Sequence, residues 1–224
     1  MWHTQLISKH RLATDIWEFR FARPDGYEYL SGQYASFSFH EPLNDARGQA
    51  RVMTFTSHPS DDYLAFVTRI SEQSSPFKLQ LSHLQLGDAL SVNVSLGDLI
   101  LPRSVETPLI FVAGGIGIAS YISMLRDIEK SGQTRNVYLL YAIRSDEERL
   151  FSDILKHFPF TSKKDFVSPS RLRVGDIVDT QDDASNALFY LSGTESFVES
   201  LTEDLLRIGL NDAKIIFDYF TGYL

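Results

Sequence analysis

Hydrophobic and polar residues alternate along much of the first hundred positions of this chain. Residues 16–21 and 35–39 show this period of two most clearly, and it is typical of β-strands that bury one face. Turn signals separate the runs, as at residues 24–26. Ser75 and Pro76 predict one short helix, as its N-cap and its first residue. The other strands that we expect are residues 5–8, 51–57, 64–70 and 90–94. Several short strands with one brief helix indicate a small barrel or sandwich.

After about residue 108 the pattern changes, and strand-like and helix-like segments alternate. An apolar run at 109–113 leads into a glycine cluster, and from Ile118 to Ile128 apolar residues recur at helical spacing. The other strands that we expect are 136–143, 165–168, 187–192 and 214–217, with helices at about 117–130, 146–157 and 195–208, the last closed by Gly209. This alternation predicts a mostly parallel sheet with helices on both faces. We therefore divide the chain into an all-β domain, 1–102, and an α/β domain, 103–224.

Composition and charge narrow the functional classes. The net charge of −8 argues against general nucleic-acid binding. Without any cysteine, the chain has no disulfide, no thiolate zinc site and no Cys-ligated iron–sulfur cluster of its own. Its six histidines are scattered, so we expect no metal site. There is no apolar run of about 18 residues and no secretion signal. We expect a cytoplasmic protein with no membrane span and no nucleic-acid partner.

The glycine cluster at residues 114–117 is the ligand site that the residues themselves indicate. Glycine lets the backbone come close to a ligand, and the following helix offers free N–H groups and a positive dipole end to a phosphate. A turn that serves only strand–helix packing is the alternative, because short glycine motifs are common. In a parallel sheet this turn would lie at the carboxyl ends of the strands, where ligands bind.

Five stretches, in chain order, give a more specific indication. They are Gly32-Gln33-Tyr34, Arg51-Val52-Met53-Thr54, Ser74-Ser75-Pro76-Phe77, the turn at 114–120, and Leu191-Ser192-Gly193-Thr194 together with Phe220-Thr221-Gly222-Tyr223. With these motifs the chain resembles the ferredoxin–NADP(+) reductase superfamily of flavoproteins, in its short two-domain bacterial form. The resemblance implies an N-terminal antiparallel flavin-binding β-barrel followed by a parallel-sheet, NAD(P)H-binding α/β domain.

In the first domain the resemblance implies a flavin site. Arg51 would pair with the flavin pyrophosphate, and the Thr54 hydroxyl would donate a hydrogen bond near the flavin N5. Met53 stands where the family has Tyr, so an aromatic contact with the ring is missing. The helix that begins after Ser75 would receive the pyrophosphate, which favours FAD over FMN. The other flavin-binding candidates are Val52, Ser74, Phe77, Phe66, Val67 and Thr68.

In the second domain the glycine turn resembles the family's Gly-Gly-Ile-Gly-Ile-Thr-Pro, which receives the nicotinamide nucleotide. Ala119 replaces the Thr, and Ser120 replaces the Pro. Ser192 stands where the family often has a Cys beside the hydride path. The resemblance thus implies three catalytic candidates in the whole chain, which are Thr54, Ser192 and Tyr223. The other candidates for the nucleotide are Gly114, Gly115, Ile116, Gly117, Gly193 and Thr194.

The choice between NADPH and NADH depends on the charges near the end of the second parallel strand. NAD sites commonly carry an acidic residue there and NADP sites an arginine, and here Arg144 follows the strand. Ser168 and Arg171 follow the third strand, where NADP-preferring relatives also bear phosphate ligands. We therefore favour NADPH as the hydride donor, with NADH as the alternative.

The C-terminal residues 217–224 are rich in aromatic side chains. In the family a C-terminal aromatic residue covers the flavin until nicotinamide displaces it, and Tyr223 is the first candidate here, with Phe220 second. Asp218 stands where relatives have an acidic residue near the flavin.

These assignments have structural alternatives. Arg51 would otherwise be an exposed strand charge, Ser75 a simple cap, and residues 66–68 core. Thr194 would be only an N-cap, Arg144 only a solvated charge, and the C-terminal aromatic residues only core.

The resulting hypothesis is a flavin-dependent oxidoreductase that passes hydride from NAD(P)H to bound FAD and electrons on to a separate acceptor. Because the chain has no cluster ligands, the acceptor would be a ferredoxin, a flavodoxin, another redox protein or a small molecule. The alternative is a regulatory or interaction protein that binds nucleotide or flavin on a reductase scaffold with little turnover. Met53, Ala119 and Ser192, which depart from the family pattern around the hydride site, keep this alternative open.

Overall fold

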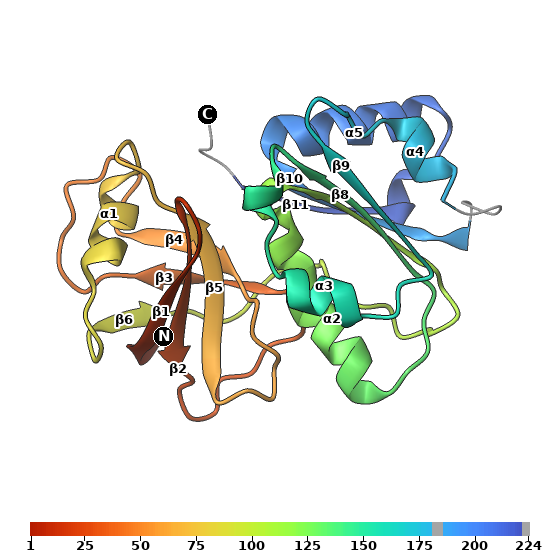
Figure 1. The fold of residues 1–224 in the computed structure, drawn as a ribbon. Coiled ribbons are helices and arrows are strands. Elements are labelled where there is room, and N and C mark those ends of the chain that lie inside the picture. The colour runs from red at the N-terminus through yellow and green to blue at the C-terminus, as the bar shows by residue number, and fades with distance from the viewer. Residues whose placement is uncertain (181–185, 221–224) are drawn as a thin grey trace. The chain divides into compact units, whose positions relative to one another are not determined.

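The structure, a computed structural model, describes residues 1–180 and 186–220 of the chain. The chain divides into two compact units, Met1–Ile100 and Leu101–Leu224, and each has its own sheet (Figure 1). In the described residues no helix has the length and apolar character needed to cross a membrane.

The first unit is an antiparallel sheet of six strands with one helix. The strands are β1 Trp2–Ala13, β2 Ile16–Ala22, β3 Tyr34–Ser38, β4 Ala50–Thr54, β5 Tyr63–Arg69 and β6 Ala89–Val92, and the helix is α1 Pro76–His83. They pair in the order β4-β3-β6-β1-β2-β5. Just after β4, Phe55 forms an antiparallel bridge with Phe66 of β5, so the two edge strands meet. The predicted antiparallel barrel is confirmed.

Aromatic residues fill the interior of this barrel. Phe66 lies at their centre, with ring centroids 4.8 Å from Phe37, 5.7 Å from Phe21 and 5.8 Å from Phe19. Stacked and tilted rings at these distances add to the free energy gained from burying their area. The side chain of Phe66 is therefore part of the core.

The second unit is a parallel sheet of five strands with helices on both faces. The strands are β7 Leu109–Gly114, β8 Val137–Ile143, β9 Ser162–Val167, β10 Leu188–Thr194 and β11 Ile215–Phe220, in the order β11-β10-β7-β8-β9. The helices α2 Ala119–Ser131 and α3 Ser152–His157 cover one face, and α4 Val174–Val178 and α5 Glu195–Arg207 cover the other (Figure 1). The predicted parallel α/β sheet is confirmed.

Alternate residues of the central strand β7 contact opposite helical layers. Ile110 and Val112 pack in the same core as Leu201 of α5, whereas Phe111 stacks on Tyr121 of α2 with centroids 4.5 Å apart. From β7 the chain runs outward through β8 and β9, and then returns to place β10 on the other side of β7. The junction of β7 and β10 is therefore the topological switch point, where ligands of such sheets bind.

The helix expected at residues 146–157 is broken, which corrects that prediction. A 3-10 turn, η2 Asp146–Glu148, comes first, and α3 begins only at Ser152. Between them the guanidinium of Arg149 binds both Asp146 and Asp165, and Phe151 adopts a positive φ of 55°. The ion pair with Asp165 ties Arg149 to β9, and the left-handed residue turns the chain, so a continuous helix does not form.

Candidate functional site

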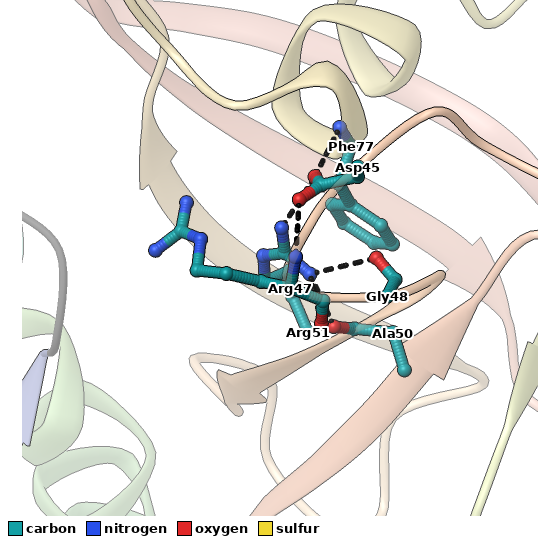
Figure 2. Close-up of polar contacts among 6 residues, drawn as sticks. All are labelled: Asp45, Arg47, Gly48, Ala50, Arg51 and Phe77. Carbon is teal, nitrogen blue, oxygen red and sulfur yellow. Dashed lines mark hydrogen bonds and ion pairs between the residues drawn. The ribbon is translucent and has the colours of Figure 1, made fainter.

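Arg51 of β4 is held by the loop that precedes this strand (Figure 2). Its Nη2 forms an ion pair with Asp45. Its Nη1 lies near three carbonyl oxygens, those of Ala50 at 2.7 Å, Gly48 at 3.0 Å and Arg47 at 3.3 Å. The side chain is only 12% exposed. Arg51 is therefore a largely buried, oriented cation and not an exposed strand charge.

Asp45 links Arg51 to the first turn of α1 (Figure 2). Its Oδ2 accepts a hydrogen bond from the backbone N–H of Phe77 at 3.1 Å, and its Oδ1 accepts one from Arg47 at 3.0 Å. Burial by itself raises the pKa of Asp45, but the hydrogen bonds from Arg51, Arg47 and Phe77 outweigh it and lower the pKa to about 2. Asp45 is therefore an anion at neutral pH, bound where a helix N-terminus favours negative charge.

Ser75 is the N-cap residue of α1, as predicted, but its hydroxyl makes no capping hydrogen bond. Ser75 Oγ and Arg51 Nε are both buried and have no hydrogen-bond partner among the described residues. Buried polar atoms without partners are rare, and a water, ion or ligand bound beside them is one explanation. We call Asp45, Arg51, Ser75 and the Phe77 N–H the α1 anion cluster. A guanidinium, a hydroxyl and a helix N-terminus fit the phosphates of a dinucleotide such as FAD.

The other flavin candidates lie on β4, on β5 and before α1. Val52 is 58% exposed, whereas Met53 is 6% exposed and packs in the core. Thr54 is buried opposite Tyr34 of β3. Val67 and Thr68 are buried in β5, and Ser74 Oγ accepts a hydrogen bond from the N–H of Ser71 at 2.9 Å. The contacts of these residues with a flavin stay predictions.

The glycine turn lies at the switch point between β7 and β10. Gly117 packs so tightly on β10 that a Cβ atom there would lie 2.2 Å from the carbonyl oxygen of Ser192. Gly114 and Gly193 also approach each other, since a Cβ on Gly193 would lie 3.4 Å from the Gly114 Cα. The ring of Phe197, in the first turn of α5, lies against both of these glycines. The turn begins as a 3-10 helix, η1 Gly115–Ile118, and Ile116 within it and the neighbouring Ala119 are buried.

Ser192 belongs to a chain of hydroxyl groups behind this turn. The Ser120 hydroxyl donates to Asp218 Oδ2 at 3.1 Å and lies 3.1 Å from Ser192 Oγ. A hydroxyl has a single proton, and the proton of Ser120 points to Asp218. In the contact between the two serines Ser192 is therefore the hydrogen-bond donor and Ser120 the acceptor. The serine that replaces the family's Pro is therefore what fixes the hydroxyl of Ser192.

Two of the residues expected to recognise a 2′-phosphate, Arg144 and Ser168, follow neighbouring strands at the same edge of the sheet. Ile143 and Val167, which end β8 and β9, are paired in register, and the N–H of Ser168 donates to the Ile143 carbonyl at 3.1 Å. Arg144 and Ser168 therefore emerge side by side. Both are exposed, as is Arg171.

At the end of β10, Thr194 is the N-cap residue of α5 by position, and its hydroxyl makes no capping hydrogen bond. The C-terminal candidates are only partly described. Phe220 ends β11, but its side chain and all of Tyr223 lie outside the described residues.

Sequence reasoning missed Asp45 and the link between Ser120 and Asp218. Asp45 lies in a loop that the sequence marks only as rich in Asn, Asp and Gly, and its contact with Phe77 spans 32 positions. The contact between Ser120 and Asp218 spans 98 positions. No local spacing signals such contacts, because only the fold brings these segments together.

Known proteins similar to this chain include reductase components of oxygenase systems and flavohemoproteins. No family model matches the sequence. The reductase component of propane 2-monooxygenase from Rhodococcus jostii is 25% identical over 98% of this chain and 63% of its own length. A ferredoxin–NAD(P)(+) reductase component of naphthalene 1,2-dioxygenase and salicylate 5-hydroxylase systems from a Ralstonia species is 27% identical over 92% of this chain and 65% of its own length. Across the curated relatives first found, the chain spans 49–65% of their length.

Solved structures show the same fold. A ferredoxin NADP+ reductase from Neisseria gonorrhoeae with bound FAD and NADP has a TM-score of 0.79 at 20% identity, over 97% of this chain and 98% of its own. The FAD/NAD-binding domain of a Vibrio cholerae nitric oxide dioxygenase has a TM-score of 0.81 at 17% identity, with the same coverage. The chain thus has the fold of the ferredoxin–NADP(+) reductase superfamily. Over most of its residues the chain is also similar in sequence to reductase components of oxygenase systems, and the resemblance indicated by the motifs is confirmed.

Proposed function

We propose that this chain is the FAD- and NAD(P)H-binding part of a flavin-dependent oxidoreductase that delivers electrons to a separate acceptor. The observation that carries the proposal is the α1 anion cluster, in which the Arg51 guanidinium lies at a helix N-terminus and two buried atoms, Arg51 Nε and Ser75 Oγ, have no hydrogen-bond partner among the described residues. Such a cluster fits a pyrophosphate, and the reductase relatives support the flavin as its owner.

On the flavin side, Arg51, Ser75 and the Phe77 N–H would hold the pyrophosphate of FAD. Thr54 ends β4, the strand that carries Arg51, and its hydroxyl is our candidate for the hydrogen bond near N5. The flavin supplies acceptance of a hydride from NAD(P)H and release of electrons one at a time. The protein's contribution is to bind and orient the two cofactors and to keep water from the reacting atoms.

On the nicotinamide side, Gly114 and Gly193 would let the nucleotide approach the backbone at the switch point. Ser192, our candidate beside the hydride path, is fully buried and its hydroxyl is hydrogen-bonded to Ser120, so it would hold β10 and the glycine turn in place for the nucleotide. Arg144, Ser168 and Arg171 would bind the 2′-phosphate of NADPH. Tyr223 as the aromatic residue over the flavin stays a prediction.

The acceptor class comes from the relatives, two of which are named as components that act with ferredoxin. We propose a ferredoxin, a flavodoxin or another redox protein as the acceptor, with small molecules as a second class. We also propose a cytoplasmic location, where NAD(P)H is available to the enzyme, and cell fractionation tests it.

The decisive experiment is an absorbance spectrum of the purified chain, with FAD added, before and after anaerobic addition of NADPH or NADH. Bound FAD that bleaches supports the reductase. A protein that binds flavin and nucleotide but does not bleach would favour the binding-protein alternative, which the departures at Met53, Ala119 and Ser192 motivate. A protein that binds no flavin at all would refute the proposal. The variant Arg51→Gln should weaken FAD binding, whereas Arg103→Gln, at an exposed arginine outside the α1 anion cluster, should not.

A further inference from the structure

The α1 anion cluster already holds an anion that belongs to the chain itself. Asp45 Oδ2 receives both Arg51 and the Phe77 N–H, which are two of the groups expected to bind a ligand's phosphate (Figure 2). We propose that Asp45 is an internal competitor for this site, which must leave before the pyrophosphate of FAD binds, and that it thereby weakens the binding of phosphate-bearing flavins while leaving that of riboflavin unaffected. This inference rests on the proposed function and names a determinant of selectivity within it.

The donors of the cluster show why displacement is required. Nη2 of Arg51 is engaged by Asp45, and Nη1 by the carbonyl groups of its own loop. Only Arg51 Nε and Ser75 Oγ remain without partners among the described residues. A pyrophosphate that bound to these two atoms while Asp45 stayed would lie beside a carboxylate, and like charges at such short range repel strongly. The ligand can therefore bind to Arg51 Nη2 and the Phe77 N–H only after it has replaced Asp45.

The charge of Asp45 makes this competition persistent. Its carboxylate is 3% exposed and accepts three hydrogen bonds, one of them from a guanidinium. With its pKa lowered to about 2, it stays ionised at neutral pH and is not released by protonation there. Only a competing anion, or movement of its loop, frees Arg51 and the Phe77 N–H.

The loop can move without disturbing the barrel. Asp45 lies between the end of β3 at Ser38 and the start of β4 at Ala50, and residues 46–50 are exposed. Of this loop, Phe39 is buried in the core against the ring of Phe77 and Leu43 packs partly on the core, so these two residues would act as the fixed points. The barrel strands therefore keep their pairing when Asp45 swings away.

The test compares ligands that differ in phosphate on Asp45→Asn and wild type. The asparagine keeps the shape and an acceptor for the Phe77 N–H but removes the charge. Asp25→Asn, in an exposed turn of the same unit, is the matched control. Dissociation constants for FAD and riboflavin come from flavin fluorescence, and that for inorganic pyrophosphate from calorimetry. We expect Asp45→Asn to bind FAD and pyrophosphate about 10- to 100-fold more tightly than wild type, which corresponds to the loss of one competing charge-assisted hydrogen bond.

Riboflavin has no phosphate, so its dissociation constant should change less than about twofold, which is the size of effect that a neutral surface substitution usually has. Unchanged or weaker binding of both FAD and pyrophosphate would overturn the inference, as would an equal shift for riboflavin. If no flavin binds to any variant, the proposed function fails, and the pyrophosphate comparison still decides the role of Asp45. If Asp45→Asn does not fold, Asp45→Ser, which keeps a hydroxyl near the helix N-terminus, takes its place.

Discussion

Replacing Gly117 by alanine tests whether the glycine turn is fixed by packing against β10. The added Cβ would lie 2.2 Å from the carbonyl oxygen of Ser192, 2.5 Å from its carbonyl carbon and 2.8 Å from the nitrogen of Gly193. All three are backbone atoms of a central strand, so no side chain can rotate to make room. The turn and the strand must separate by about 1 Å, and overpacking of this kind costs about 3 kcal/mol.

The measurement is thermal and urea unfolding followed by circular dichroism. For a chain of this size about 3 kcal/mol corresponds to a Tm lower by about 6–12 °C. Gly175→Ala is the control, since it lies in α4 of the same unit and a Cβ there meets nothing within 4 Å. In a helix this change is expected to stabilise by up to about 1 kcal/mol. If Gly117→Ala unfolds at the same temperature as Gly175→Ala, the close approach of the turn to β10 is wrong.

Three further predictions concern charge and hydrogen bonding. Asp45, whose pKa is lowered from 3.8 to about 2 on folding, adds stability that is fully present above about pH 4 and is lost as the pH falls towards 2. Urea unfolding of wild type and Asp45→Asn should therefore differ most above pH 4 and converge by pH 2, and a constant difference would contradict it. Arg144→Ala should raise the KM for NADPH about tenfold and leave that for NADH nearly unchanged, as loss of a phosphate contact requires. Ser120→Ala should cost about 1–2 kcal/mol, and a double-mutant cycle with Ser192→Ala should give a coupling free energy of at least about 0.5 kcal/mol if the two hydroxyls interact.

Much of the fold follows from local pattern. The period of two in residues 16–21 and the apolar run at 109–113 predict β2 and β7 within one residue. The pattern does not give strand order, because pairing depends on contacts between distant segments. It also fails where a tertiary interaction interrupts a helical period, as the ion pair of Arg149 with Asp165 does between residues 146 and 157.

The residues of the candidate site likewise fall into those that local sequence predicts and those that only the fold brings together. Ser75 and the glycine turn are found from the sequence because a cap and a tight turn have local signatures. The partner of Arg51 is not found, since Asp45 is one of several polar residues in a loop, and its role appears only when α1 is placed beside β4. The sequence indicates which groups bind an anion, but not that the chain supplies an anion of its own.

The structure also separates two uses of glycine that the motif alone leaves together. At Gly117 the missing side chain makes room for the backbone of Ser192, so this glycine serves packing whether or not a ligand binds. At Gly114 and Gly193 a Cβ would instead meet ring atoms of Phe197, at 2.9 Å and 2.8 Å. A ring at the end of two rotatable bonds can move, whereas a strand cannot. We therefore expect a nucleotide to use the space beside Gly114 and Gly193, and alanine there should impair nucleotide binding more than it impairs folding, the reverse of what is expected at Gly117.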